Sequence, residues 1–214
     1  PIFGFPEAKE GGYDFSSIEV DKDGNNFSEE ELDRITGDPT KTHKIVKEII
    51  SKTKDRLGVL IFCSTKKHCK EAAQALPKGS YGIVSDSTGY KERNKIYKTS
   101  RSGEIKYLLN VGVLATGYNN PRIDTVCYLR PLDSLTLLIQ TLGRGFRIPE
   151  ATDDFTKTNC LVLDYGDVFA RLGGLYENPI LEVAVKEGAV RKGKTIICPA
   201  CNEVNSMMAR RCVG

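Results

Sequence analysis

The chain has 214 residues, 40% of them hydrophobic and 28% charged, and carries a formal net charge of +3. This composition is ordinary for a packed globular protein and excludes a largely disordered chain. The small positive charge permits nucleic-acid binding without demanding it, and no apolar run approaches the roughly 18 residues needed to span a bilayer. We therefore expect a cytoplasmic protein without membrane contact.

The first forty residues are rich in Gly, Asp, Glu and Ser and predict a connecting arm. Within this arm Ser28 precedes Glu31 in a capping-box arrangement, which indicates one short helix. Residues 21–25 resemble the start of a calcium loop, but Leu32 stands where such a loop needs a bidentate glutamate. A surface turn is therefore the better interpretation of residues 21–25.

Strands and helices then alternate along the chain. Ile45, Val46 and Ile49 lie on one face of a predicted helix over residues 41–56, and Val59–Cys63 is a continuous apolar run typical of a strand covered on both faces. Further strands are predicted at Tyr81–Ser85, Ile105–Leu109, Thr125–Leu129 and Cys160–Asp164, and further helices over residues 65–77, 90–101 and 135–142. This alternation predicts an α/β fold with a doubly wound parallel sheet, flanked by helices on both faces.

The segment Gln140–Arg147 carries the clearest chemistry. It sets Arg144 and Arg147 three residues apart at a predicted helix end, beside Gly143, which would let a ligand approach the backbone. Two guanidinium groups can clamp one phosphate, and the fixed charge of an arginine suits the charge that develops on a transferred phosphoryl group. In isolation, however, such a pair more often caps a helix end in solvent.

The same segment resembles motif VI of the superfamily 2 helicases, Gln-x-x-Gly-Arg-x-x-Arg, at every defining position. The resemblance implies that the chain is the second RecA-like motor domain of an ATP-dependent helicase. It also implies that Arg147 is the arginine finger, that Arg144 and Gln140 are further catalytic residues, and that Gly143 contacts the nucleotide.

Half of an ATP site is missing from the sequence. It contains no Gly-x-x-x-x-Gly-Lys-Ser/Thr phosphate loop and no Asp-Glu-x-His or Asp-Glu-x-Asp stretch that could hold magnesium. ATP and Mg²⁺ would therefore be bound together with an N-terminal RecA-like domain of the same parent protein. By itself the chain is expected to be inactive.

Residues 107–121 resemble motif V of the same helicases, in which a strand ends in a glycine-containing loop. The resemblance implies a phosphate contact at Thr116, a close approach at Gly117 and a nucleotide contact at Asn119. Asn119 stands where many relatives have Asp, so its hydrogen bond to a ribose would be weaker. Ligands at such a loop also agree with the general rule for open α/β sheets.

Two further stretches resemble parts of the helicase nucleic-acid face. Val59–Thr65 is similar to motif IV, which implies that Ser64 and Thr65 hold a nucleic-acid phosphate. Simple N-capping of the next helix by Thr65 explains the same pattern equally well. Thr88 and Arg93 belong to a stretch that often contributes to this face in the family, although a solvated helix charge is the simpler interpretation of Arg93.

The seven cysteines fall into two groups. The first, which lacks any framework spacing and is expected to consist of buried reduced thiols, comprises Cys63, Cys69, Cys127 and Cys160. Cys198, Cys201 and Cys212 have zinc-ribbon spacing and supply three thiolate ligands for a structural Zn²⁺, whose fourth ligand would lie past Gly214. Exposed reduced thiols in a disordered end are the alternative.

The predicted organisation is a connecting arm over residues 1–40, a helicase C-terminal RecA-like domain over 41–180, and a linker with a truncated zinc-ribbon-like tail over 181–214. Motifs V and VI, the Leu-Arg-Pro stretch at 129–131 and the cysteine tail together resemble bacterial RadD-type DNA-repair helicases, which are relatives of XPB. This implies a DNA substrate gripped mainly by its phosphates. Asp164 ends the last predicted strand in the same likeness, with a functional or a purely structural role.

Two alternatives to a repair helicase remain open from the sequence. The chain could be the translocase domain of a restriction or remodelling enzyme, in which the same motor would serve a different activity. It could also be a non-catalytic α/β module that binds nucleic acid or protein through its cysteine tail.

Overall fold

The computed structural model of the chain describes residues 6–8, 11–18, 27–113, 118–151, 153–172, 195–197 and 204–206. The chain forms two compact units, Pro1–Arg171 and Leu172–Gly214. Within the described ranges, no helix is long and apolar enough to cross a membrane.

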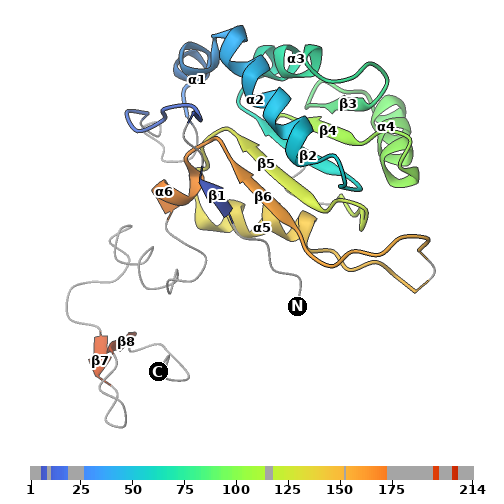
Figure 1. The fold of residues 1–214 in the computed structure, drawn as a ribbon. Helices are drawn as coiled ribbons and strands as arrows, with labels where there is room; N and C mark the ends of the chain where they lie inside the picture. The colour runs from blue at the N-terminus through green and yellow to red at the C-terminus, as the bar shows by residue number, and fades with distance from the viewer. Residues whose placement is uncertain are drawn as a thin grey trace. The chain divides into compact units, whose positions relative to one another are not determined.

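A parallel sheet forms the centre of the first unit, with strand order β1-β6-β5-β2-β4-β3 (Figure 1). Its strands are β1 (Pro6–Ala8), β2 (Val59–Cys63), β3 (Tyr81–Val84), β4 (Tyr107–Asn110), β5 (Thr125–Leu129) and β6 (Leu161–Asp164). The five strands from β2 to β6 lie where the apolar runs predicted them, and β1 is a short addition at the edge. The predicted α/β fold with a parallel sheet is confirmed.

Helices cover both faces of this sheet, with α1, α2 and α3 on one side and α5 on the other (Figure 1). They are α1 (Glu29–Thr36), α2 (Pro39–Lys52), α3 (Lys66–Gln74), α4 (Tyr90–Ser102), α5 (Leu135–Gly145) and α6 (Val168–Leu172). Ile49 of α2 belongs to the same buried cluster as Ile61 and Cys127 of the sheet. Neighbouring residues along a strand point to opposite faces, and Tyr128 accordingly reaches Thr141 of α5, with 2.7 Å between the two hydroxyl oxygens.

The described part of the predicted arm is packed into the domain. Tyr13, Phe15 and Ile18 are buried and belong to the main hydrophobic cluster, and β1 pairs with β6. Residues 11–18 of the predicted connecting arm are therefore anchored in the domain, because a few apolar side chains in a polar stretch suffice to bury it. Residues 21–25, interpreted above as a surface turn, lie outside the described residues.

The cysteines described in the first unit are buried, and the second unit contains a short hairpin. Cys63, Cys69, Cys127 and Cys160 are free and buried, as expected, and burial raises the pKa of the Cys160 thiol to about 12. In the second unit, β7 (Thr195–Ile197) and β8 (Val204–Ser206) pair antiparallel. The three cysteines of the predicted zinc site lie outside the described residues.

Candidate functional site

Helix α5 holds the motif VI residues in a fixed position on the sheet. Ser134 caps its start by accepting a hydrogen bond from the Leu137 N–H at 3.3 Å. At its other end Gly145 lies so close to the sheet that a Cβ there would overlap Cys160 Sγ and lie 2.7 Å from Val126 Cγ2. Only glycine allows this approach, so the end of α5 sits directly over the starts of β5 and β6.

The two arginines at this end of the helix, Arg144 and Arg147, lie in different environments. Arg144 is half-buried and donates a hydrogen bond of 2.9 Å from Nη1 to the backbone oxygen of Tyr118. Burial, and then the nearby charge of Arg147, lower the pKa of Arg144, so the two guanidinium groups lie in one neighbourhood. Arg147 and Gln140 are exposed. A Cβ at Gly143 would meet nothing within 4 Å, so its backbone is open to a ligand.

The end of motif V lies against this helix end. Asn119 follows Tyr118, the partner of Arg144; its own side chain is exposed, and its backbone oxygen accepts a hydrogen bond of 2.9 Å from Arg101 Nε. The structure thus brings predicted nucleotide contacts from motifs V and VI to one edge, at the amino end of β5. Thr116 and Gly117 lie outside the described residues.

Asn120, which sequence reasoning passed over, is the structural member of this Asn-Asn pair. It is buried, and its Nδ2 donates to Ser100 Oγ at 3.1 Å and to Tyr118 Oη at 2.9 Å. Its Oδ1 accepts from the Arg122 N–H at 3.0 Å. These three bonds fix the backbone on which the Asn119 side chain stands.

Lys157 is a second residue that the sequence did not reveal. Its ammonium donates to the backbone oxygens of Ile123 at 2.5 Å, Arg147 at 2.9 Å and Pro121 at 3.4 Å. The chain that follows motif VI therefore turns back and is tied to the start of β5. A single lysine in a polar loop carries no sequence signal that could have predicted this role.

The motif IV hydroxyls have internal partners at the carboxyl edge of the sheet. Ser64 is buried and donates from Oγ to the Leu129 oxygen at 2.9 Å. Thr65 accepts from the His68 N–H at 3.1 Å and donates to Asp33 Oδ1 at 2.5 Å. Thr65 is therefore an N-cap, as the simpler interpretation predicted. The phosphate contacts expected of both hydroxyls stay predictions.

A cavity of about 310 Å³ opens at the same carboxyl edge, where β3 and β4 end and α3 and α4 begin. It is lined by Lys66, Cys69, Lys70, Ile83, Ser85, Ser87, Thr88, Glu92 and Val111. The set joins the predicted contact Thr88 to two lysines, one of which, Lys66, pairs with the exposed Asp86 at 2.7 Å. Cations and hydroxyls of this kind suit a phosphate backbone.

The interpretation of Arg93 as a solvated charge was wrong. Its Nη2 donates to the backbone oxygens of Ser85 at 2.7 Å and Thr88 at 3.3 Å. The turn between β3 and α4 leaves these carbonyls without a partner in a helix or strand, and a guanidinium one turn into α4 can reach both. Arg93 thus stiffens the turn that carries Thr88.

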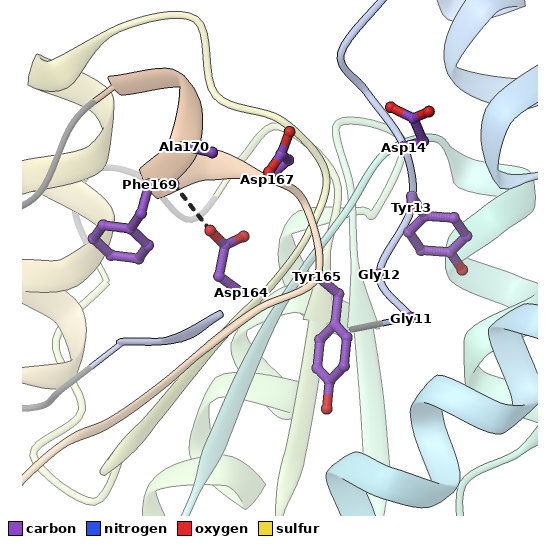
Figure 2. Close-up of a pocket in the computed structure, with 9 residues that line it drawn as sticks. All are labelled: Gly11, Gly12, Tyr13, Asp14, Asp164, Tyr165, Asp167, Phe169 and Ala170. Carbon is purple, nitrogen blue, oxygen red and sulfur yellow. Dashed lines mark hydrogen bonds between the residues drawn. The ribbon is translucent and has the colours of Figure 1, made fainter. Parts of the chain in front are cut away.

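A second cavity, of about 260 Å³, lies beside Asp164 (Figure 2). The Asp164 carboxylate accepts backbone N–H bonds from Gly166 at 3.0 Å, Val168 at 3.1 Å and Phe169 at 2.9 Å. Burial raises the pKa of Asp164 in spite of these bonds, which favour the ionised form. The three bonds cap α6 and support the structural reading of this residue.

The available residues fit the phosphates of a nucleotide better than its metal. Arg144, Arg147 and the open backbone at Gly143 offer charge and access at one edge. Within the described ranges, no group of three or more His, Cys, Asp or Glu side chains could hold a metal ion.

Comparisons with known proteins agree with the motifs. The family described as helicase conserved C-terminal domain matches residues 40–149. A protein named as the ATP-dependent helicase IRC3 of Saccharomyces cerevisiae is 29% identical over 131 residues, which cover 57% of this chain and 18% of the relative. The mitochondrial ATP-dependent helicase irc3 named in Schizosaccharomyces pombe is 29% identical over 133 residues, 59% of this chain and 20% of the relative.

A solved structure shares the fold. A fragment described as an HsdR subunit of a type I restriction enzyme from Vibrio vulnificus superposes with a TM-score of 0.58 at 18% identity, covering 71% of this chain and 32% of that one. The matches to the two curated relatives span about a fifth of their length. Since the family match covers more than half of the 214 residues, the chain belongs to the helicase conserved C-terminal domain family.

Proposed function

We propose that this chain is the second motor domain of an ATP-dependent DNA helicase or translocase. It would supply the arginine finger, Arg147, and part of the DNA-binding face. The observation that carries the proposal is the hydrogen bond from Arg144 to the Tyr118 oxygen, which joins motif VI to the end of motif V at one edge. An N-terminal RecA-like domain would face this edge and supply the phosphate loop and the ligands of Mg²⁺.

Each residue at this edge has a role that its environment supports. Arg147 is exposed and can reach a phosphate presented by a facing domain, whereas the tether to Tyr118 gives Arg144 one orientation. Gly143 leaves room for the nucleotide, and Asn119 and Gln140 present exposed amides to it. ATP, when bound, provides the phosphoryl group whose transfer to water drives the motor.

DNA would be held at the opposite, carboxyl edge. The cavity that contains Thr88 offers phosphates the ammonium group of Lys70 and that of Lys66, which a phosphate would share with Asp86. Motif V leaves β4 at this edge and reaches Tyr118 at the other, so one segment joins the two proposed ligands along the chain. This connection, which includes Thr116, supports a coupling between the nucleotide bound at one edge and the affinity for DNA at the other.

The finer assignment rests on the motifs. The Leu-Arg-Pro stretch at 129–131 and the tail cysteines Cys198, Cys201 and Cys212 support a RadD-type, XPB-related helicase of DNA repair with a zinc ribbon. A protein that continues past Gly214 should then carry about one zinc ion per chain. Elemental analysis that finds no zinc in such a protein would remove the ribbon from the proposal.

The test is DNA-stimulated ATP hydrolysis by the full-length protein that carries this chain. Replacing Arg147 by Ala should lower turnover by about 10³-fold or more while DNA binding changes little. Arg34→Ala, at an exposed position of α1, is the matched control and should turn over normally. The 214-residue chain alone should show no turnover. Near-normal hydrolysis in the Arg147 variant would contradict the finger and favour a non-catalytic binding module.

A further inference from the structure

Tyr90 presents an aromatic ring to solvent at the start of α4. It is 80% exposed, the largest exposed fraction among the large hydrophobic side chains of the described ranges. Tyr97 on the same helix, by contrast, packs against Tyr118 with 4.5 Å between ring centroids. A single exposed apolar side chain needs no explanation by itself. The residues around Tyr90, however, indicate a ligand for its ring.

The backbone that carries Tyr90 is held rigidly. Thr88 Oγ1 accepts a hydrogen bond from the Ser85 N–H at 2.9 Å, and Arg93 bonds the Ser85 and Thr88 oxygens from the other side. These contacts close the turn immediately before Tyr90 and hold the first turn of the helix behind it. A backbone that is already fixed removes part of the ordering cost when a ligand stacks on the ring.

Helix α4 is the most basic helix of the described part of the chain. Its 13 residues contain five basic side chains and one acidic side chain, a local excess of +4 in a chain whose total is only +3. The basic residues are Lys91, Arg93, Lys95, Lys98 and Arg101, and all of them except Arg93 are exposed. This charge is complementary to a polyanion.

The cavity at the carboxyl edge is lined by close neighbours of Tyr90 in the chain. Thr88 and Glu92, two residues before and after Tyr90, both line it, together with Lys66 and Lys70. An exposed aromatic ring together with nearby cations is the combination by which proteins bind single strands: the cations follow the backbone and a base stacks on the ring.

We infer that Tyr90 is a stacking platform for one base of a single-stranded nucleic acid, whose backbone lies on Lys91 and the adjoining cavity. The inference rests on the proposed function, which places nucleic acid at this edge, and deepens it by naming the strand type. A duplex hides its base faces inside the stack, so Tyr90 favours an unpaired strand. The contact reads no sequence, since every base has a flat face.

The experiment measures binding of the 214-residue chain at low salt to oligothymidylate and to an abasic oligomer of equal length and charge. Tyr90→Ala should weaken binding of oligothymidylate by about 5- to 100-fold and leave the abasic oligomer unchanged. Tyr90→Phe keeps the ring and should bind both like wild type. Lys91→Ala, as a charge control, should weaken both alike and reduce the salt slope by about one.

A direct contact test supports the titration when affinity is low. Irradiation with a 5-iodouracil strand should cross-link the wild-type chain at Tyr90, which peptide mapping identifies. Equal effects of Tyr90→Ala on both oligomers, or no effect on either, would overturn the stacking site alone. Failure of the wild-type chain to bind or cross-link to any strand would overturn the proposed DNA face as well, so the two failures are distinguishable.

Discussion

Lys157 donates a hydrogen bond of 2.9 Å to the backbone oxygen of Arg147, the proposed arginine finger. The same ammonium bonds the oxygens of Ile123 and Pro121 at the amino edge of the sheet. Burial lowers the pKa of Lys157, as expected for a cation half withdrawn from water. One side chain therefore fixes the backbone at the point where the finger leaves α5.

Replacing Lys157 by Met should impair both stability and turnover. Three carbonyls lose a charged donor, which should lower the free energy of unfolding by about 1–3 kcal/mol. Displacement of Arg147 should lower ATP turnover of the full-length protein by up to about 100-fold. Urea unfolding and steady-state hydrolysis measure the two effects.

The control for the Lys157 prediction is Lys47→Met, at an exposed position of α2, which should change stability by less than about 0.5 kcal/mol. Lys157→Arg keeps the charge and should recover part of the loss. Normal turnover by the Met variant, under conditions where it is folded, would show that Lys157 does not position the finger.

His68 links the N-terminal segment to motif IV through a chain of hydrogen bonds. Its Nδ1 accepts from the Ser64 N–H at 3.4 Å, so the neutral ring carries its proton on Nε2, which lies 2.9 Å from Tyr13 Oη. Tyr13 Oη in turn lies 2.7 Å from Thr42 Oγ1. Burial is the main cause that lowers the pKa of His68 to about 4, opposed in part by the charge of Asp33.

This lowered pKa predicts a loss of stability in acid. Between pH 6.5 and pH 4 His68 is protonated in the unfolded chain but neutral in the folded chain. The contribution of neutral His68 to the free energy of unfolding is therefore complete above pH 6.5 and is lost as the pH falls to 4. The loss should be about 3 kcal/mol, read from unfolding curves across this range. His68→Gln should remove this slope. Parallel pH profiles for wild type and variant would refute the assignment to His68.

Much of the fold could be predicted because burial leaves a clear mark on sequence. Strands β2 and β5 are buried at every residue, and their apolar runs identified them without ambiguity. Motif VI was equally readable, since its residues have a fixed spacing along the sequence at the end of α5. The burial of Tyr13 could not be predicted, because its hydrogen-bond partners Thr42 and His68 lie up to 55 residues away and no local pattern reveals them.

The missed residues of the site share one physical cause. Arg93, Asn120 and Lys157 all act by bonding backbone or side-chain groups brought near by the fold, and each is an ordinary polar residue in sequence. Their roles depend on which polar groups the folded chain brings within reach of their side chains. The proposed catalytic and ligand-binding residues could be predicted from the motifs. The residues that hold them in place could be identified only from the three-dimensional structure.

Two glycines of motif VI meet opposite environments although they are two residues apart on α5. A Cβ on Gly145 would overlap Cys160 Sγ, whereas a Cβ on Gly143 would meet nothing within 4 Å. Gly145 is therefore required by packing. At Gly143 the structure gives no packing reason for glycine, which leaves ligand approach as its proposed reason.

The pair predicts substitutions of opposite sign. Gly145→Ala should lower the free energy of unfolding by about 1–3 kcal/mol through overpacking, while Gly143→Ala should raise it by about 0.5–1 kcal/mol, since alanine favours a helix interior. Urea unfolding of the 214-residue chain measures both. In the full-length protein Gly143→Ala should nevertheless lower ATP turnover, because the added methyl group occupies space left for the nucleotide. A Gly143 variant that is more stable and turns over normally would show that the open backbone there serves no ligand.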